Sequence, residues 1–179
     1  MWVFVLKNKS DTFEKFKEWH TLIENQMGTK LKGLRTDNGL EFVSEQFNEF
    51  CRLKGIKRHK IVPRTPQQNG LAERMNRTLL ERVRCMLLGA GLPKSFWGEV
   101  VTTAAYLINR CPSTGIDFKT PMEVWSGKPA DYSSLKVFGA LAYAHIKQDK
   151  LEPRALICVF IGFPEGVKGY KLWKLESTG

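Results

Sequence analysis

Residues 31–62, LKGLRTDNGLEFVSEQFNEFCRLKGIKRHKIV, contain the pattern from which the fold class follows. Leu31 to Thr36 has the composition of a short strand, and the Asp37-Asn38-Gly39 sequence after it is a turn signal. Ser44 is a typical N-cap for the helix that follows. Ile56 to Val62 is a second strand with several basic side chains. A strand, a helix and a strand in this order predict an α/β fold.

The sequence on both sides extends this pattern. Trp2 to Leu6 predicts a further strand, and apolar residues from Phe13 to Ile23 recur at helical spacing. The same spacing predicts a long helix from Leu71 to Met86 and another from Phe96 to Ile108. Nearer the carboxyl end the apolar period becomes that of strands, and three short ones are predicted over residues 137–146, 156–163 and 169–175.

These elements predict three parts. Residues 1–111 form an α/β core that ends in helices, and residues 135–179 form a small β-rich appendage. Residues 112–134, rich in Pro, Gly and Ser, form a connector between them.

The charge of the chain is strongly basic and unevenly distributed. The net charge is +10 and the isoelectric point is about 9.6. Residues 50–72 contain no acidic residue but six basic ones: Arg52, Lys54, Lys57, Arg58, Lys60 and Arg64. A local positive field of this kind favours a polyanionic partner, usually a nucleic acid. The alternative is a basic surface that binds no partner.

Several classes of protein are disfavoured. No apolar run approaches the roughly 18 residues of a membrane-spanning helix, so no membrane association is predicted. The four cysteines are widely separated, which argues against a disulfide framework and favours an intracellular location, nuclear or cytoplasmic. The three histidines are also dispersed, so local spacing suggests no zinc site.

Two carboxylates occupy positions at which chemistry can occur. Asp37 follows a strand, and strand ends in open α/β sheets point their side chains into a ligand crevice. Glu73 lies on the first turn of the long helix, opposite its apolar stripe. Either residue alone has a simpler interpretation, since Asp37 can be a turn former and Glu73 a solvated carboxylate near a helix N-terminus. Between them lie 35 residues.

Two segments, Leu34–Phe42 (LRTDNGLEF) and Pro66–Thr78 (PQQNGLAERMNRT), resemble the integrase core of long-terminal-repeat retrotransposons. In that family thirty-five residues separate the second Asp and the Glu of an Asp-Asp-Glu triad, as they separate Asp37 and Glu73 here. Further segments resemble the copia group, and with them the resemblance covers practically the whole chain: 96–97, 104–110, 120–121, 124–128, 137–139 and 150–170.

The resemblance implies a ribonuclease H-like fold and metal-dependent phosphoryl transfer in DNA integration. Asp37 and Glu73 would be catalytic residues and ligands of Mg²⁺ or Mn²⁺, hard cations that prefer carboxylate oxygens. The implied partners are element and target DNA and further copies of the chain. The residues expected to contact DNA are Lys57, Arg58, Lys60, Arg64, Gln67, Gln68, Asn69, Arg74 and Arg77.

The chain departs from the family pattern at its amino end. The family's first Asp lies on a strand upstream of the one that begins here at Trp2, so a core lacking its first strands and one carboxylate is expected. Metal binding is then expected to be weak and catalysis incomplete, which leaves enzymatic activity open. A non-catalytic nucleic-acid-binding protein derived from a transposon and a decayed remnant are the alternatives. A bacterial insertion-sequence transposase shares the fold but is not expected to match residues 97–170.

The basic segment predicts DNA binding that is independent of sequence and depends strongly on salt. Each phosphate neutralised contributes about −0.9 to the slope of log K against log salt concentration. Replacing Lys57, Arg58 and Lys60 with Ala is therefore expected to flatten the slope by up to about 3 units. Fluorescence anisotropy with labelled duplex DNA measures the slope. A slope near zero for the unmodified protein would rule out nucleic-acid binding.

Overall fold

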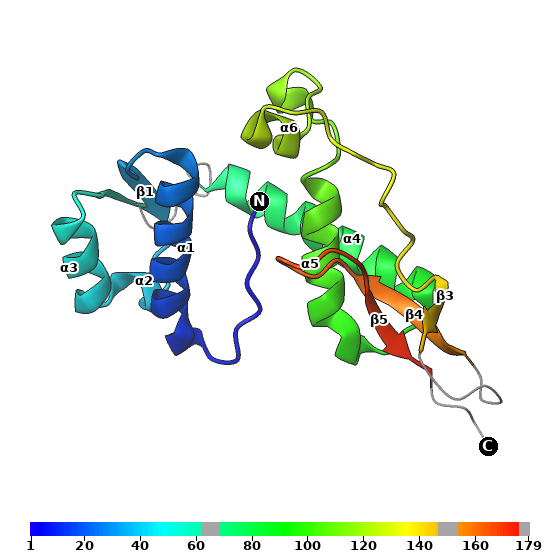
Figure 1. Cartoon of the computed structure of the whole chain (residues 1–179). Coiled ribbons are helices and arrows are strands. Elements are labelled where there is room, and N and C mark those ends of the chain that lie inside the picture. Colours follow the sequence, from blue (N-terminus) through cyan, green and yellow to red (C-terminus); the bar gives the residue numbers. More distant parts are fainter. Residues whose placement is uncertain (62–68, 147–153, 176–179) are drawn as a thin grey trace. The chain divides into compact units, whose positions relative to one another are not determined.

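The computed structural model describes residues 1–61, 69–146 and 154–175 (Figure 1). These residues form two compact units. Phe4–Met75 make up the first, here called the β1–β2 unit. Met1–Val3 and the residues from Asn76 onward make up the second, the β3–β5 unit. No helix within the described ranges is long and apolar enough to cross a membrane.

The β1–β2 unit is built on a pair of parallel strands. Strands β1 (Gly33–Thr36) and β2 (Lys57–Lys60) pair with Gly33 opposite Lys57 and Thr36 opposite Lys60. Parallel strands require a crossover between them, and two helices provide it here. The described helical elements of the unit are η1 (Lys9–Asp11), α1 (Thr12–Met27), α2 (Leu40–Val43), α3 (Glu45–Leu53) and the first turns of α4 (Gly70–Ala90).

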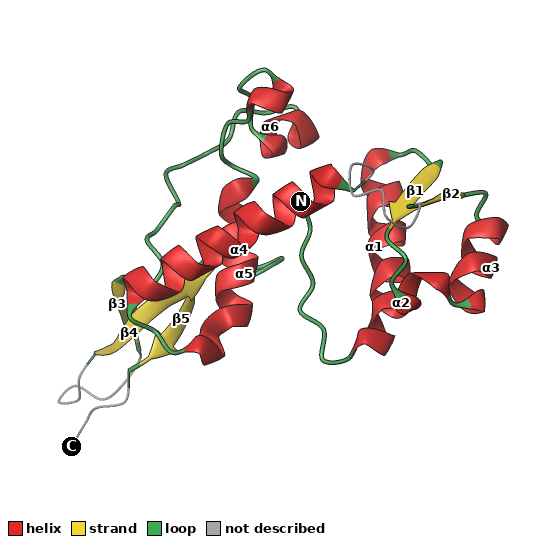
Figure 2. Ribbon diagram, turned by 180° about the vertical axis from the view of Figure 1, so that it is seen from behind, coloured by secondary structure: helices red, strands yellow, loops and turns green. Residues whose placement is uncertain are grey.

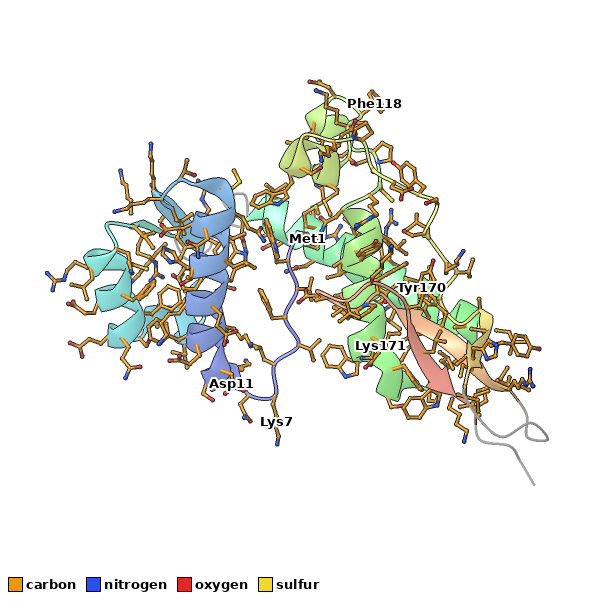
Figure 3. All side chains as sticks on the ribbon, in the orientation of Figure 1. Met1, Lys7, Asp11, Phe118, Tyr170 and Lys171 are labelled. Atoms are coloured by element: carbon orange, nitrogen blue, oxygen red, sulfur yellow. The ribbon has the colours of Figure 1, made fainter. Side chains whose placement is uncertain are left out.

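The ends of these helices follow local sequence signals. Helix α1 begins after Asp11, which Figure 3 labels, and ends at Gly28, whose positive φ of 61° suits a residue without a Cβ atom. Helix α3 begins after Ser44, whose side chain accepts a hydrogen bond from the Phe47 backbone N–H. Both helices confirm the sequence prediction. Helix α2 was not predicted, because its four residues are too few to show a periodic pattern.

Aromatic residues form the core of the β1–β2 unit. Phe47 is fully buried, and Cys51 and Ile56 are buried beside it. The ring centroid of Phe47 lies 4.8 Å from that of Phe16 and 5.6 Å from that of Phe42. Helices α1, α2 and α3 therefore meet at a single side chain.

The β3–β5 unit combines helices with an antiparallel sheet (Figure 2). Strand β4 (Ala155–Gly162) pairs with β3 (Leu141–His145) on one side and β5 (Lys171–Lys174) on the other. The sheet packs on helix α5 (Trp97–Ile108), where the Thr103 hydroxyl donates to the Ile161 carbonyl at 3.3 Å. Three strands and this helix were predicted, and the structure confirms them: β3, β5 and α5 are shorter than predicted, and β4 is shifted by one residue. The remaining elements are η3 (Lys94–Phe96), η4 (Thr114–Ile116) and α6 (Pro121–Ser126).

A salt bridge also links the sheet to α5. The Lys171 ammonium on β5, labelled in Figure 3, lies 3.0 Å from the Glu99 carboxylate. Near η4, Asp117 and Phe118 both adopt positive φ, and Phe118 is 74% exposed.

The predicted strand at Trp2 to Leu6 is wrong. This segment has no regular structure, because none of the described strands pairs with it. Its first residue instead exchanges two hydrogen bonds with the Asn109 side-chain amide: the Met1 amino group donates to Oδ1 at 2.6 Å and the Met1 carbonyl accepts from Nδ2 at 2.7 Å. A strand needs a neighbour as well as a suitable composition.

The predicted connector at residues 112–134 contains the unpredicted helix α6. Thr120 and Glu123 form a capping box around Pro121, so the sequence did carry a signal for this helix. The division at residues 111 and 134 stays a prediction.

Truncating Phe47 is expected to destabilise the β1–β2 unit. Removal of a fully buried phenyl ring costs about 3–5 kcal/mol, because the cavity closes only in part. In the same helix, Leu53 is 73% exposed, and Leu53→Ala should change the free energy of unfolding by less than about 0.5 kcal/mol. Urea unfolding followed through the amide NMR signals of α1 and α3 makes the comparison. Equal effects of Phe47→Ala and Leu53→Ala would contradict this core.

Candidate catalytic and nucleic-acid site

Asp37 lies directly after the last residue of β1, at the end of the parallel strand pair. Its side chain is exposed, and Oδ1 accepts a hydrogen bond of 3.1 Å from the Gly39 backbone N–H. Within the described residues, Oδ2 has no hydrogen-bond partner. The Asn38 side chain donates to the Ile61 carbonyl at 2.8 Å, which ties the turn to the end of β2. This carboxylate is therefore available to a ligand at a strand end.

A second carboxylate, Glu41, lies close to Asp37. A Cβ atom placed on Gly39 would lie 2.9 Å from Glu41 Oε1 and 3.1 Å from Asp37 Oδ1. The two acidic side chains therefore border the same glycine. No role was predicted for Glu41, because its proximity to Asp37 arises from the turn.

Glu73 is exposed on the first turn of α4. Its backbone N–H donates to the Asn69 carbonyl at 3.0 Å, so Asn69 lies at the start of the helix. A carboxylate in this position is stabilised by the positive end of the helix dipole. The other loop residues predicted to contact DNA, Arg64, Gln67 and Gln68, lie outside the described residues.

The side chains of Asp37 and Glu73 are suitable ligands for a hard divalent cation. Both are exposed carboxylates, and Mg²⁺ or Mn²⁺ takes such oxygens together with water. Among the residues that the structure describes, no three His, Cys, Asp or Glu side chains come together in a metal-binding group. The donor type thus fits the cation, and the number of protein ligands is small.

Four of the predicted DNA-contacting cations are exposed. Lys57 and Lys60 lie on β2, and Arg74 and Arg77 lie on α4. Long basic side chains with exposed ends can neutralise phosphates without sequence preference.

Arg58 differs from these neighbours, because its guanidinium makes its hydrogen bonds inside the β1–β2 unit. Nη2 donates to Thr36 Oγ1 at 3.0 Å and to the Phe42 carbonyl at 2.8 Å. Burial raises the pKa of the nearby Cys51 thiol, and the positive charge of Arg58 acts in the opposite direction. The flattening of the salt slope is therefore expected from Lys57 and Lys60, up to about 2 units instead of 3.

The chain is similar in sequence to polyproteins of plant transposons. It is 51% identical over 176 residues to the retrovirus-related Pol polyprotein from transposon TNT 1-94 of Nicotiana tabacum. The match covers 97% of this chain and 13% of that protein. Identity to the retrovirus-related Pol polyprotein from transposon RE2 of Arabidopsis thaliana is 34% over 165 residues, covering 90% of this chain and 11% of the relative. The chain thus spans a small part of either polyprotein.

A family model and a solved structure also relate the chain to retroviral proteins. The retroviral polymerase SH3-like domain matches residues 140–178, which include the three-stranded sheet. The fold resembles that of a chain in the cryo-electron microscopy structure of the simian T-cell lymphotropic virus intasome in complex with PP2A regulatory subunit B56 gamma. The TM-score is 0.52 at 18% identity, and the alignment covers 95% of this chain and 64% of that chain. The fold-class prediction is confirmed.

If Asp37 and Glu73 bind the same cation, Mn²⁺ should reveal it. A bound paramagnetic ion broadens the signals of nearby nuclei, so the amide signals of residues 37–39 and 70–73 should broaden together at substoichiometric Mn²⁺. The same titration on Asp37→Asn should lose the broadening in both segments. Broadening of one segment alone, or its persistence in Asp37→Asn, would show that the two carboxylates do not share a site.

Proposed function

Because the chain belongs to the retrovirus-related Pol polyproteins of copia-type plant transposons, we propose that it is a part of an integrase that inserts element DNA into target DNA. The observation that supports this most directly is the placement of Asp37. It is an exposed carboxylate at the end of a parallel strand pair, within a sequence related to these polyproteins along 97% of its length.

Asp37 and Glu73 are the proposed ligands of Mg²⁺ or Mn²⁺. Bound metal supplies Lewis-acid stabilisation of the oxygens that attack and leave during phosphoryl transfer. The exposed carboxylates of this chain supply hard oxygen ligands on a strand end and on a helix. Their fixed positions matter because charge stabilises a transition state best when it is placed in advance.

Exposed cations are the proposed DNA contacts. Lys57 and Lys60 extend from the strand next to β1, and Arg74 follows Glu73 directly on α4. Contacts of this type hold the phosphate backbone and position the duplex, but they carry no base specificity. The net charge of +10 favours the same polyanionic partner. Multiple copies of the chain on paired DNA ends are part of this proposal.

These 179 residues alone are proposed to be catalytically incomplete. The family pattern requires three carboxylates, and the segments that match it here provide two, Asp37 and Glu73. The third would come from the part of the polyprotein that precedes the matched region in the relatives, of which this chain spans 13% and 11%. Partial removal of a group of residues that act together costs orders of magnitude in rate.

The expected result is that this chain neither trims nor joins DNA ends. Fusing the segment that precedes the matched region in the Nicotiana tabacum polyprotein should restore joining of end-mimicking DNA with Mg²⁺ or Mn²⁺. In the fused protein, Asp37→Asn and Glu73→Gln should each lower the rate by at least about 100-fold. A strand-transfer assay on labelled DNA measures the rates.

Asp11→Asn is the matched control, because it makes the same change at a helix N-cap of the same unit, where Asn also serves. It should leave joining unchanged. Robust joining by the 179-residue chain, lost in Asp37→Asn, would show that another of its residues completes the site. DNA binding by the fused protein without joining would favour a non-catalytic DNA-binding protein.

A further inference from the structure

The side chain of Arg58 is half-buried in the β1–β2 unit. Its guanidinium stacks over the fully buried Phe47 ring, with its central carbon 4.6 Å from the ring centroid. Its Nε atom is buried and has no hydrogen-bond partner among the residues that the structure describes. A cation placed in this way is expensive to desolvate, so its partners must compensate for the cost.

Those partners lie on both sides of the turn that carries Asp37. Thr36, whose hydroxyl accepts from Nη2 at 3.0 Å, is the residue immediately before Asp37. Phe42, whose carbonyl accepts from the same nitrogen at 2.8 Å, lies in α2, just beyond the turn. The two hydrogens of Nη2 thus join the two ends of the segment 37–41. A longer contact of 3.4 Å from Nη1 to Asn48 Oδ1 extends the connection to α3.

We propose that Arg58 is a positioning residue that holds the Asp37 turn in place for metal binding. This inference rests on the proposed function in one respect, namely that Asp37 is a metal ligand. Asp37 itself is exposed, and among the described residues it receives one hydrogen bond, from the N–H of Gly39 two residues away. That local contact moves with the turn, so it cannot fix the turn relative to the strands. Two other contacts can: the Asn38 side chain bonds the Ile61 carbonyl just after β2, and Arg58, which belongs to β2, reaches across to the end of β1.

Only arginine meets all these demands at position 58. Its planar head can lie flat on the Phe47 ring and direct the two diverging hydrogens of one nitrogen to two acceptors. A lysine ammonium carries the same charge but concentrates its donors at one point and does not stack as a plane. Partners that orient a metal ligand are worth about 10- to 100-fold in metal affinity. Arg58 therefore raises the affinity of Asp37 for the metal without contacting the metal itself.

The test uses two variants, each with a matched control in the same unit. Arg58→Lys retains the charge and removes the double contact, with Arg52→Lys as its control, because Arg52 pairs with Glu49 on the surface. Thr36→Val preserves the shape of the side chain and removes the acceptor next to Asp37. Its control is Thr21→Val, because within the described part of the chain the Thr21 hydroxyl bonds the carbonyl of Lys17 on its own helix and no other group. If Arg58→Lys fails to fold, Thr36→Val carries the test.

The first measurement is the order of the turn, from ¹⁵N relaxation without metal. Backbone order parameters of residues 38–41 should fall from about 0.85 to below about 0.6 in both variants and in neither control. The second is the affinity for Mg²⁺ alone, from the amide shifts of residues 37–39. The dissociation constant should rise about tenfold in Arg58→Lys. In Thr36→Val it should rise roughly two- to tenfold, and the unfolding midpoint should fall, because the Arg58 guanidinium loses one of its acceptors.

An unchanged order parameter or an unchanged Mg²⁺ affinity in Thr36→Val would overturn the proposal. Asp37→Asn separates it from the proposed function. If Asp37→Asn leaves the Mg²⁺-induced shifts intact, Asp37 is not a metal ligand and the proposed function fails at that residue. The relaxation measurement then still decides whether Arg58 orders the turn, because that measurement is made without metal.

Discussion

The packing of Arg58 on Phe47 connects the apolar core of the β1–β2 unit to its polar edge. The Phe47 ring contacts aromatic residues of α1 and α2, and the guanidinium that bonds β1 and α2 also lies over it. Burial of the ring stabilises the unit. The hydrogen bonds of the cation are directional, so they fix the end of β1 relative to α2. The exposed carboxylate at the end of β1 depends on both.

Local signals explain what the sequence could predict. Ser44 and Gly28 are residues whose preference for helix ends has a chemical cause, and both mark helix ends in the structure. The 35-residue interval from Asp37 to Glu73 likewise identified a family that the comparisons bear out. The strand predicted at Trp2 failed because pairing is not a local property.

Local sequence signals also failed to predict the position of single side chains in the candidate site. Lys57, Arg58 and Lys60 are all basic, and all three were predicted from the sequence to contact DNA. In the strand, however, successive side chains point to opposite faces, so Lys57 is exposed while Arg58 is directed into the unit. Glu41 was missed for a related reason, since its proximity to Asp37 arises from the turn at Gly39.

The two-stranded parallel sheet has a practical consequence for handling the protein. Among the described residues, β1 and β2 pair only with each other, so each strand has one edge without a neighbouring strand. Parallel sheets are ordinarily enclosed, and an open edge is a template for the backbone of another molecule. The purified chain should therefore aggregate more strongly as its concentration rises. A short peptide able to add to that edge should keep the chain in solution at concentrations where it otherwise precipitates.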